Sequence, residues 1–414
     1  MHQHVIQSIG ARLEEAETRY VAANPESQRL HKQRARFMPG GNTRTTIHVA
    51  PFPLTIARGE GARIVDADGH EYVDFLGEYT AGLYGHSHPV IVAAIRDALA
   101  DGIVLGAPNR YEALLAETVC ARFPSIELVR FCNSGTEANL LALSLARVVT
   151  GRSGVLTFTG AYHGGITAPY EWTTATYNDD ADAVRTINAK ADELAAVIVE
   201  PLQGAGGVIP GDAQFLRALR EATKAAGVLF IFDELMTSRL SLCGMQRILG
   251  ITPDLTKVAK YIGGGLAFGA LGGRADLMSR FDPSRPDAIA HGGTFNNDVL
   301  TMAAGAAAAR LLTEQEIVRV NGLGDRLRDR LNALDRDFCA TGYGSLVGMH
   351  FTRGPVRSAA EVPEARELRS LLHLHMLEQG FSYGRRGFIA LSLPLGEEEV
   401  DGFAAAVEHF LTSL

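Results

Sequence analysis

Short apolar segments alternate with helical stretches from Leu128 onward, and this alternation limits the possible folds more than any other feature. The segments are LVRFC, GVLTF, AAVIVE and VLFIFD, and AQFLRALREATKAAG is a typical helical stretch between them. Strands that are apolar on both faces and separated by helices are typical of a parallel sheet that helices cover on both sides. The sequence therefore predicts an α/β domain with a mostly parallel sheet.

The two ends of the chain have a different character. A helix is predicted over about residues 6–23, and the turn residues at 66–69 predict an antiparallel hairpin. After about residue 312, charged amphipathic helices alternate with the strand-like stretches SLVGMHF and FIALSLPL. We therefore predict an N-terminal segment that joins a small domain (1–75), a large α/β domain (76–312) and a C-terminal small α+β domain (313–414).

Composition excludes several classes of partner. The net charge is −8 and the 39 basic residues are scattered, which argues against a nucleic acid or an anionic membrane surface. The four cysteines show no CxxC spacing, so neither a metal site nor a disulfide framework is indicated. The first residues show no apolar signal core and no run of about 18 apolar residues occurs, so we expect neither a signal peptide nor a membrane-spanning helix. We expect a cytoplasmic protein.

The stretch FCNSGTEAN suggests an anion site. A predicted strand ends at Cys132, the polar turn Asn133–Thr136 follows, and a helix is predicted from Glu137. Backbone N–H groups and hydroxyls at a helix N-terminus bind phosphate well. The alternative is that Ser134 or Thr136 only caps the helix. The nucleotide-binding patterns GxxxxGK and GxGxxG are absent in the required context, which disfavours ATP and NAD.

Other chemically notable residues follow further strands. Tyr162 and His163 come after GVLTF, Asp233 ends the apolar strand VLFIFD, and Lys260 follows DLTKVA. In open α/β sheets, ligands bind at the carboxyl ends of the strands, so these side chains are candidates for one site. Taken singly, Tyr162 could be a core aromatic and Lys260 a surface lysine. A buried Asp233 would need a cationic partner.

These motifs carry a family resemblance. NSGTEAN, GAYHGG, VEPLQG, FDELMTS, KYIGGG and GGTFNN occur in the order and at the spacing of class III (ω-type) aminotransferases of fold type I, which use pyridoxal 5'-phosphate. The resemblance implies that Ser134, Gly135 and Thr136 hold the cofactor phosphate. It also implies an obligatory homodimer, with Thr294 reaching the phosphate in the neighbouring active site.

The same resemblance implies roles around the cofactor ring. Tyr162 would lie against the ring with His163 nearby, and Glu200 and Gln203 would line the pocket beneath Asp233. Asp233 would keep the ring nitrogen protonated, and Lys260 would bind the cofactor covalently and act as base and acid. Lys260 and Asp233 are therefore the predicted catalytic residues.

Two arginines bear on the substrate. Arg44 and Arg386 could each bind a carboxylate in a bidentate way, as a transaminase with two acid substrates requires. Alternatively, both make ion pairs between domains. Tyr79, Ala81 and Tyr84 in EYTAGLYG are candidate walls for a substrate side group.

The substrate class follows from a narrower resemblance. MPGGNTR, GEYTAGLYGHS and RGFIALSLPL are similar to the aromatic β-amino acid aminotransferases, and the chain is also similar to glutamate-1-semialdehyde aminomutase. We expect ping-pong transfer of the amino group of a β-amino acid, such as β-phenylalanine or a medium apolar one, to 2-oxoglutarate or pyruvate. The aminomutase activity is one alternative. A non-catalytic dimer that binds the cofactor or another phosphorylated ligand is the other.

Overall fold

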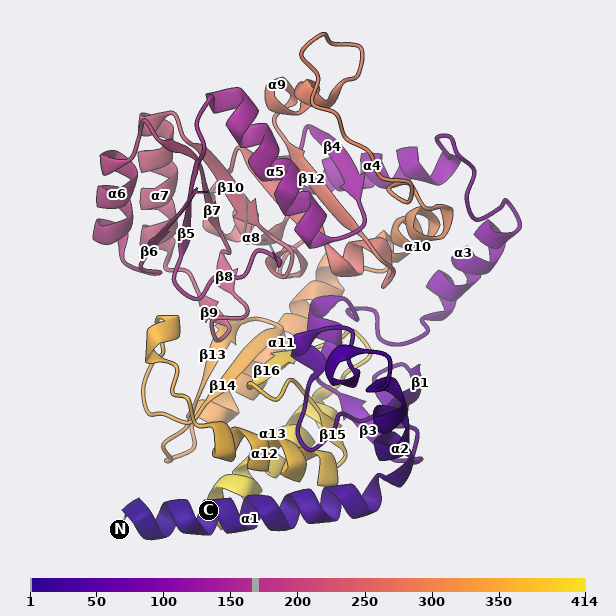
Figure 1. The fold of residues 1–414 in the computed structure, drawn as a ribbon, viewed down its shortest axis with the longest axis vertical. Helices are drawn as coiled ribbons and strands as arrows, with labels where there is room; N and C mark the ends of the chain where they lie inside the picture. Colours follow the sequence, from indigo (N-terminus) through magenta and orange to yellow (C-terminus); the bar gives the residue numbers. More distant parts are fainter. Residues whose placement is uncertain (1, 166–170) are drawn as a thin grey trace.

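The computed structural model describes residues 2–165 and 171–414. Figure 1 shows one unit built around a large sheet and a second unit that contains both ends of the chain. The chain begins with two helices, α1 (His2–Ala23) and α2 (Pro25–Arg34), where we predicted only one. Proline is tolerated at the first position of a helix but not inside one, so Pro25 starts α2 rather than extending α1.

A small sheet follows the N-terminal helices. The predicted hairpin is confirmed, because β2 and β3 pair antiparallel around it. Its turn is closed by Asp66, whose Oδ1 accepts hydrogen bonds from the backbone N–H groups of Asp68 (3.0 Å) and His70 (2.8 Å). The sheet has the order β1-β2-β3-β15, so a strand from near the end of the chain completes it. Its strands are β1 (Ile56–Glu60), β2 (Arg63–Asp66), β3 (Glu71–Asp74) and β15 (Phe381–Ser382).

The large sheet has the order β4-β12-β11-β10-β7-β5-β6. The predicted mostly parallel α/β sheet is confirmed from β11 to β6, but β12 runs antiparallel to both β4 and β11. We did not predict β12, because its sequence GALGG is poor in the residues that favour strands. The strands are β4 (Leu128–Cys132), β5 (Gly154–Phe158), β6 (Glu171–Ala175), β7 (Leu194–Val199), β10 (Leu229–Asp233), β11 (Leu255–Ala259) and β12 (Gly269–Gly273).

Helices cover both faces of this sheet (Figure 1). On one face, Ile231 of β10 packs with Leu143 and other residues of α5. On the other face, Phe230 packs with Phe215 of α7. Burial on both faces explains why these strands are almost entirely apolar. The helices of this part are α3 (Pro89–Leu99), α4 (Arg110–Arg122), α5 (Gly135–Thr150), α6 (Asp180–Ala189), α7 (Ala213–Ala226), α8 (Gly244–Leu249), α9 (Ala275–Met278) and α10 (Val299–Ala309).

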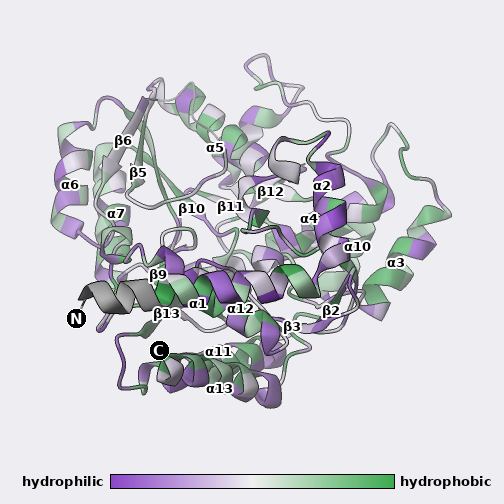
Figure 2. Ribbon diagram, turned by 60° about the horizontal axis from the view of Figure 1, so that its bottom comes forward, coloured by the Kyte–Doolittle hydropathy of each residue, from purple (hydrophilic) through white to green (hydrophobic). Residues whose placement is uncertain are grey.

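The C-terminal part packs against the N-terminal segment. Tyr20, Phe52 and Phe75 from the start of the chain share one core with Leu327 and Phe403 from its end. Figure 2 shows α11 and α13 side by side, each with hydrophobic and hydrophilic residues. The domain boundaries given above remain a prediction. The elements here are α11 (Glu314–Asn332), α12 (Arg366–Glu378), α13 (Glu397–Ser413), β13 (Cys339–Tyr343), β14 (Leu346–His350) and β16 (Phe388–Ala390).

Short elements connect these layers. They are the strands β8 (Leu202–Gln203) and β9 (Ile209–Pro210) and the 3-10 helices η1 (Pro39–Gly41), η2 (Thr45–Ile47), η3 (Gly77–Thr80), η4 (Thr237–Arg239), η5 (Lys260–Gly263), η6 (Ser279–Phe281) and η7 (Ala359–Glu361). Among residues 2–165 and 171–414, no helix combines the length and the apolar character needed to cross a membrane.

Candidate active site

The polar turn after β4 forms the N-terminus of α5. The helix begins at Gly135, slightly earlier than predicted, and Ser134 is its N-cap. The Ser134 hydroxyl accepts a hydrogen bond from the backbone N–H of Glu137 (3.2 Å), so Ser134 does cap the helix. The first N–H groups of a helix have no partner within it and are available to an anion. A Cβ atom on Gly135 would overlap the end of the Leu235 side chain, which would then have to move.

Asp233 ends β10 and is only 4% exposed. Its Oδ2 atom accepts hydrogen bonds from His163 Nδ1 and from Lys257 Nζ, both at 2.7 Å. Burial alone would raise the pKa of the Asp233 carboxyl, but the Lys257 ammonium and the His163 hydrogen bond outweigh burial and hold that pKa well below its usual range. We expected a cationic partner for a buried Asp233, and within the protein that partner is Lys257.

We did not single out Lys257 or Asn139 from the sequence. Lys257 is 0% exposed, and its Nζ also donates to Asn139 Oδ1 on α5 (2.8 Å). The available signal was a lysine inside the otherwise apolar strand LTKVA, because a charged residue in a strand buried on both faces needs a partner.

His163 connects Asp233 to the neighbouring strand. Burial lowers the pKa of the imidazole, so the ring is neutral near pH 7. With its proton on Nδ1, the ring donates to Asp233 and its Nε2 accepts from the Thr157 hydroxyl (3.2 Å). His163 therefore helps to orient Asp233.

Glu200 and Gln203 lie close to this group. Glu200 accepts from the backbone N–H groups of Tyr162 (2.9 Å) and Gly204 (3.1 Å), and burial together with the charge of Asp233 raises its pKa to about 8. Gln203 donates to the Thr159 carbonyl (3.0 Å), and its buried Oε1 has no hydrogen-bond partner among the described residues. The Tyr162 side chain is 59% exposed, so its ring is accessible to a ligand.

Lys260 follows β11 and begins η5. Its Nζ donates to the backbone oxygen of Tyr79 (2.6 Å), and burial lowers its pKa to about 8. The carboxyl groups of Asp233 and Glu200 raise the pKa of Lys260, but burial has the larger effect. Both carboxyl groups therefore lie near enough to Lys260 to act on it electrostatically. A lysine with such a pKa is partly neutral near pH 7, as a nucleophile or base must be.

The two predicted arginines lie in different settings. Arg44 forms an ion pair with Glu78, and both side chains are half exposed. Arg386 is exposed in the turn before β16 and has no hydrogen-bond or ion-pair partner in the described parts of the chain. Both act electrostatically on Tyr79, so both lie near the residue that contacts Lys260.

The candidate wall residues divide into two groups. The Tyr79 ring packs on Phe388, with centroids 5.4 Å apart, and Ala81 is partly buried. Tyr84 is buried in the core against the ring of Tyr261. Tyr79 and Ala81 remain candidate wall residues, whereas the surroundings of Tyr84 are those of a core tyrosine.

Comparisons with known proteins agree with this geometry. Residues 46–175 and 166–368 match the model of the family described as aminotransferase class-III. The chain is 48% identical to beta-phenylalanine transaminase of Variovorax paradoxus over 98% of this chain and 96% of that protein. The crystal structure of the V. paradoxus beta-phenylalanine aminotransferase matches with a TM-score of 0.96 and covers 98% of both chains. A glutamate-1-semialdehyde 2,1-aminomutase of Sorangium cellulosum is 34% identical over 94% of this chain and 97% of that protein.

The fold is that of the pyridoxal-phosphate-dependent enzymes of fold type I. The chain belongs to the class-III aminotransferases and is a pyridoxal-phosphate-dependent transaminase. Its residues fit the cofactor. A glycine opens the N-terminus of α5, the buried Gln203 Oε1 has no partner among the described residues, and Lys260 has a lowered pKa beside an ionised Asp233.

Proposed function

We propose that this transaminase moves the amino group of a β-amino acid, aromatic or medium apolar in its side group, to 2-oxoglutarate or pyruvate by a ping-pong mechanism. The observation that carries the proposal is the 48% identity to a beta-phenylalanine transaminase over almost the whole of both chains. The aminomutase relative is more distant, at 34% identity. We therefore favour amino transfer from a β-amino acid over isomerisation as the activity of this enzyme.

The cofactor is held at both ends by residues of the described site. The N-terminus of α5, with Ser134, Gly135 and Thr136, binds the phosphate. Tyr162 offers its exposed ring to the cofactor ring, and Glu200 and Gln203 line the pocket beside His163. Lys260 would hold the cofactor through its Nζ atom. When bound, pyridoxal phosphate withdraws electrons from the carbon that carries the amino group.

Asp233 and Lys260 divide the proton chemistry between them. Asp233 is ionised, so when the cofactor is bound this carboxylate would keep the ring nitrogen protonated. Lys260, with a pKa of about 8, can take a proton from the nitrogen-bearing carbon and return it. For a β-amino acid this carbon is Cβ. The Tyr79 carbonyl orients the Lys260 ammonium before the reaction begins.

Arg44 and Arg386 bind the substrate carboxylates. Arg386 is accessible and unpaired in the described parts of the chain, which supports a role in binding the keto acid. Arg44 is paired with Glu78, so a substrate carboxylate has to compete with that side chain. Tyr79 and Ala81 lie where an apolar side group would be seated.

We also propose a cytoplasmic homodimer. The four cysteines are free, which agrees with a reducing compartment. The apolar side chains of Ile103, Val104, Leu105 and Phe295 are about half exposed, and together with Thr294 they line one small surface pocket. Such a contiguous apolar patch is typical of a protein interface, and it is continuous with the loop that carries Thr294.

A donor and acceptor panel tests the activity. Purified enzyme is given β-phenylalanine, medium apolar β-amino acids and α-amino acids, each with 2-oxoglutarate or pyruvate, and the keto products are measured. The proposal expects transfer from β-amino acids. Isomerisation of glutamate-1-semialdehyde without transfer would establish the aminomutase instead, and cofactor binding without either reaction would establish a binding protein. Lys260→Ala enzyme is the control for background reaction.

Subunit mixing tests the shared site. Lys260→Ala and Thr294→Ala subunits are unfolded together and refolded, and the activity of the mixture is compared with that of each variant alone. If Thr294 acts in the neighbouring site, each mixed dimer contains one site with both native residues, and activity is restored. No gain in activity, with mixed dimers verified by mass, would place both residues of a site on one chain.

A further inference from the structure

The side chain of Lys257 contacts Asp233, and the proposed mechanism gives it no role. Its ammonium is fully buried, with Asp233 Oδ2 at 2.7 Å and Asn139 Oδ1 at 2.8 Å. Asn139 itself is 0% exposed. A buried ammonium is costly unless it is paired and hydrogen-bonded, so the position of Lys257 is tied to these two oxygens.

The sheet brings the two charges together directly. Strands β10 and β11 are parallel, and Asp233 is in register with Lys257. Asp233 Oδ2 receives two donors, from Lys257 and from His163. Among the described residues, the other oxygen, Oδ1, accepts only a long hydrogen bond, from the backbone N–H of Leu235 (3.3 Å). Because a carboxylate oxygen can accept more than one hydrogen bond, Oδ1 keeps its capacity for a further donor.

We propose that Lys257 is a positioning residue that fixes Asp233 through Oδ2, keeps it ionised and leaves Oδ1 for the protonated ring nitrogen of the cofactor. The inference rests on the proposed function of Asp233. Three other titratable groups lie near the carboxylate. His163 shares Oδ2 with Lys257, the charge of Asp233 helps to raise the pKa of Glu200, and the Lys260 ammonium is held by the Tyr79 carbonyl. Without Lys257, burial would leave Asp233 protonated at a much less acidic pH.

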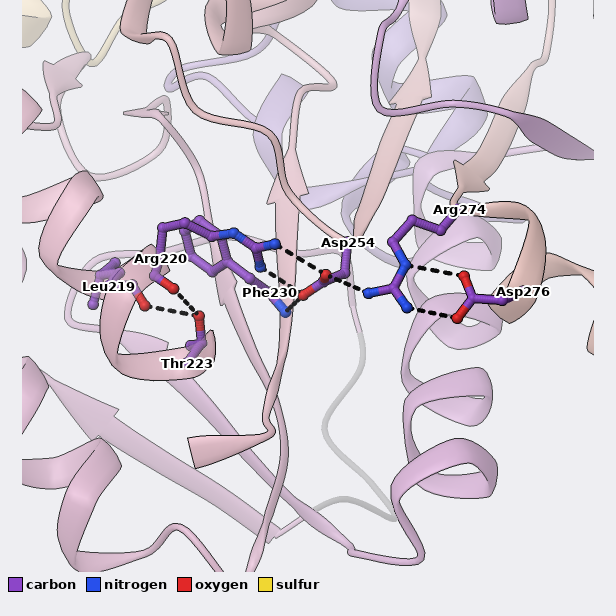
Figure 3. Close-up of polar contacts among 7 residues, drawn as sticks. All are labelled: Leu219, Arg220, Thr223, Phe230, Asp254, Arg274 and Asp276. Atoms are coloured by element: carbon purple, nitrogen blue, oxygen red, sulfur yellow. Dashed lines mark hydrogen bonds and ion pairs between the residues drawn. The ribbon is translucent and has the colours of Figure 1, made fainter. Parts of the chain in front are cut away.

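A second buried carboxylate of the same sheet offers a matched control. Asp254 lies just before β11, at the opposite end from Lys260, and is also 4% exposed. It accepts hydrogen bonds from Arg220 (2.8 and 3.2 Å), Arg274 (3.1 Å) and the backbone N–H of Phe230 (2.9 Å) (Figure 3). Removing Arg220 takes a cation from a buried carboxylate far from the site.

The test compares cofactor binding by wild type, Lys257→Met, Asp233→Asn, the double variant and Arg220→Met. The dissociation constant of pyridoxal phosphate is measured by titrating each apo-protein between about pH 5.5 and pH 8, and thermal unfolding of the apo-proteins is recorded in parallel. We expect Lys257→Met to weaken binding at least about tenfold. The loss should grow toward low pH, because Asp233 then takes up a proton that Lys257 no longer opposes.

Two comparisons separate positioning from general stability. In the Asp233→Asn background, Lys257→Met should change the dissociation constant by less than about threefold, because Lys257 acts through Asp233. Arg220→Met should lower the unfolding temperature and leave cofactor binding unchanged. If Lys257→Met does not fold, Lys257→Gln is used, which keeps a side-chain N–H donor but removes the charge.

The outcomes have distinct meanings. A dissociation constant within about threefold of wild type in the Lys257 variant, or an equal loss with and without Asp233, overturns the proposal. An equal loss in Arg220→Met does the same, because it would reflect destabilisation alone. If Asp233→Asn binds the cofactor like wild type at all pH values, the proposed function of Asp233 fails instead.

Discussion

The Nζ atom of Lys260 lies 2.6 Å from the backbone oxygen of Tyr79, in a turn where Glu78, Tyr79 and Thr80 all have positive φ. Such conformations are costly for residues other than glycine and persist only where the surrounding structure imposes them. Lys260 itself has φ of 62°. The contact joins the large sheet to the segment that follows the N-terminal hairpin. It also fixes the orientation of the Lys260 side chain within the site.

The lowered pKa of Lys260 predicts how the stability of the apo-protein depends on pH. The folded protein releases this proton near pH 8, whereas an unfolded lysine keeps it until about pH 10.5. Between these values the unfolded state binds more protons, so stability rises with pH. From about pH 7 to about pH 9.5, the free energy of unfolding of wild type should rise by about 2 kcal/mol relative to Lys260→Met. Urea denaturation measures it, and a constant difference would contradict the expected pKa.

Covalent attachment should occur at Lys260 and not at Lys257. Reduction of the holoenzyme with borohydride, followed by peptide mass analysis, should find the cofactor on the peptide that contains Lys260. In Lys260→Ala no attachment is expected, and kcat for transfer should fall by at least about 10³-fold, because the proton-transfer group is lost. Lys257→Met, saturated with cofactor, is the control and should still be labelled. Labelling at Lys257 would require a different assignment of the site.

Arg386→Met should raise the KM for the keto acid and have little effect on the stability of the protein. Arg386 is exposed and without a partner in the described parts of the chain, so its loss leaves no buried charge. The KM for the acceptor should rise about 10- to 100-fold, as expected for one charge-assisted bidentate contact. Arg385→Met is the matched control, because Arg385 acts on the buried His373 and Tyr383 instead. Equal effects of the two variants would argue against a specific role for Arg386.

The Arg44–Glu78 ion pair predicts opposite effects of its two partners. Glu78→Gln should lower the KM for the β-amino acid, because it removes the carboxylate that competes for Arg44. Arg44→Met should raise that KM. Both side chains are half exposed, so either change should alter the free energy of unfolding by less than about 1 kcal/mol. Steady-state kinetics and denaturation together check this, and shifts of KM in the same direction would exclude competition at Arg44.

Gly269 on β12 packs against the backbone of Ser134, in the turn that we propose binds the cofactor phosphate. A Cβ atom there would overlap the backbone oxygen of Ser134, which cannot move without shifting the start of α5. Gly269→Ala should lower the free energy of unfolding by about 1–3 kcal/mol and also weaken pyridoxal phosphate binding. In Gly272→Ala of the same strand, the new Cβ would meet the side chain of Ile126 instead. This control should lose stability without losing cofactor affinity.

Much of the site could be predicted from local patterns. The strands that precede Ser134, Tyr162, Asp233 and Lys260 are apolar and end in polar or glycine-rich turns, and parallel strands bring such turns to one edge of a sheet. The structure has these strands where they were predicted, and Ser134 caps α5. These features were visible because periodicity, turn residues and helix caps depend on neighbours in the chain.

Contacts between distant segments could not be predicted in this way. We did not predict β12, because its glycines do not favour a strand. Its pairing with β4 and β11 stabilises it instead. The pairing of Asp233 with Lys257 depends on the register of two strands, and the Lys260 contact with Tyr79 depends on a turn 181 residues away.

The sequence by itself determined the class of fold, the charged residues at the strand ends and the candidate cofactor. The tertiary structure alone decided which charges meet and which are shielded from water. A pKa depends on desolvation and on charges a few ångströms away, and both are set by packing between segments that are remote in the sequence.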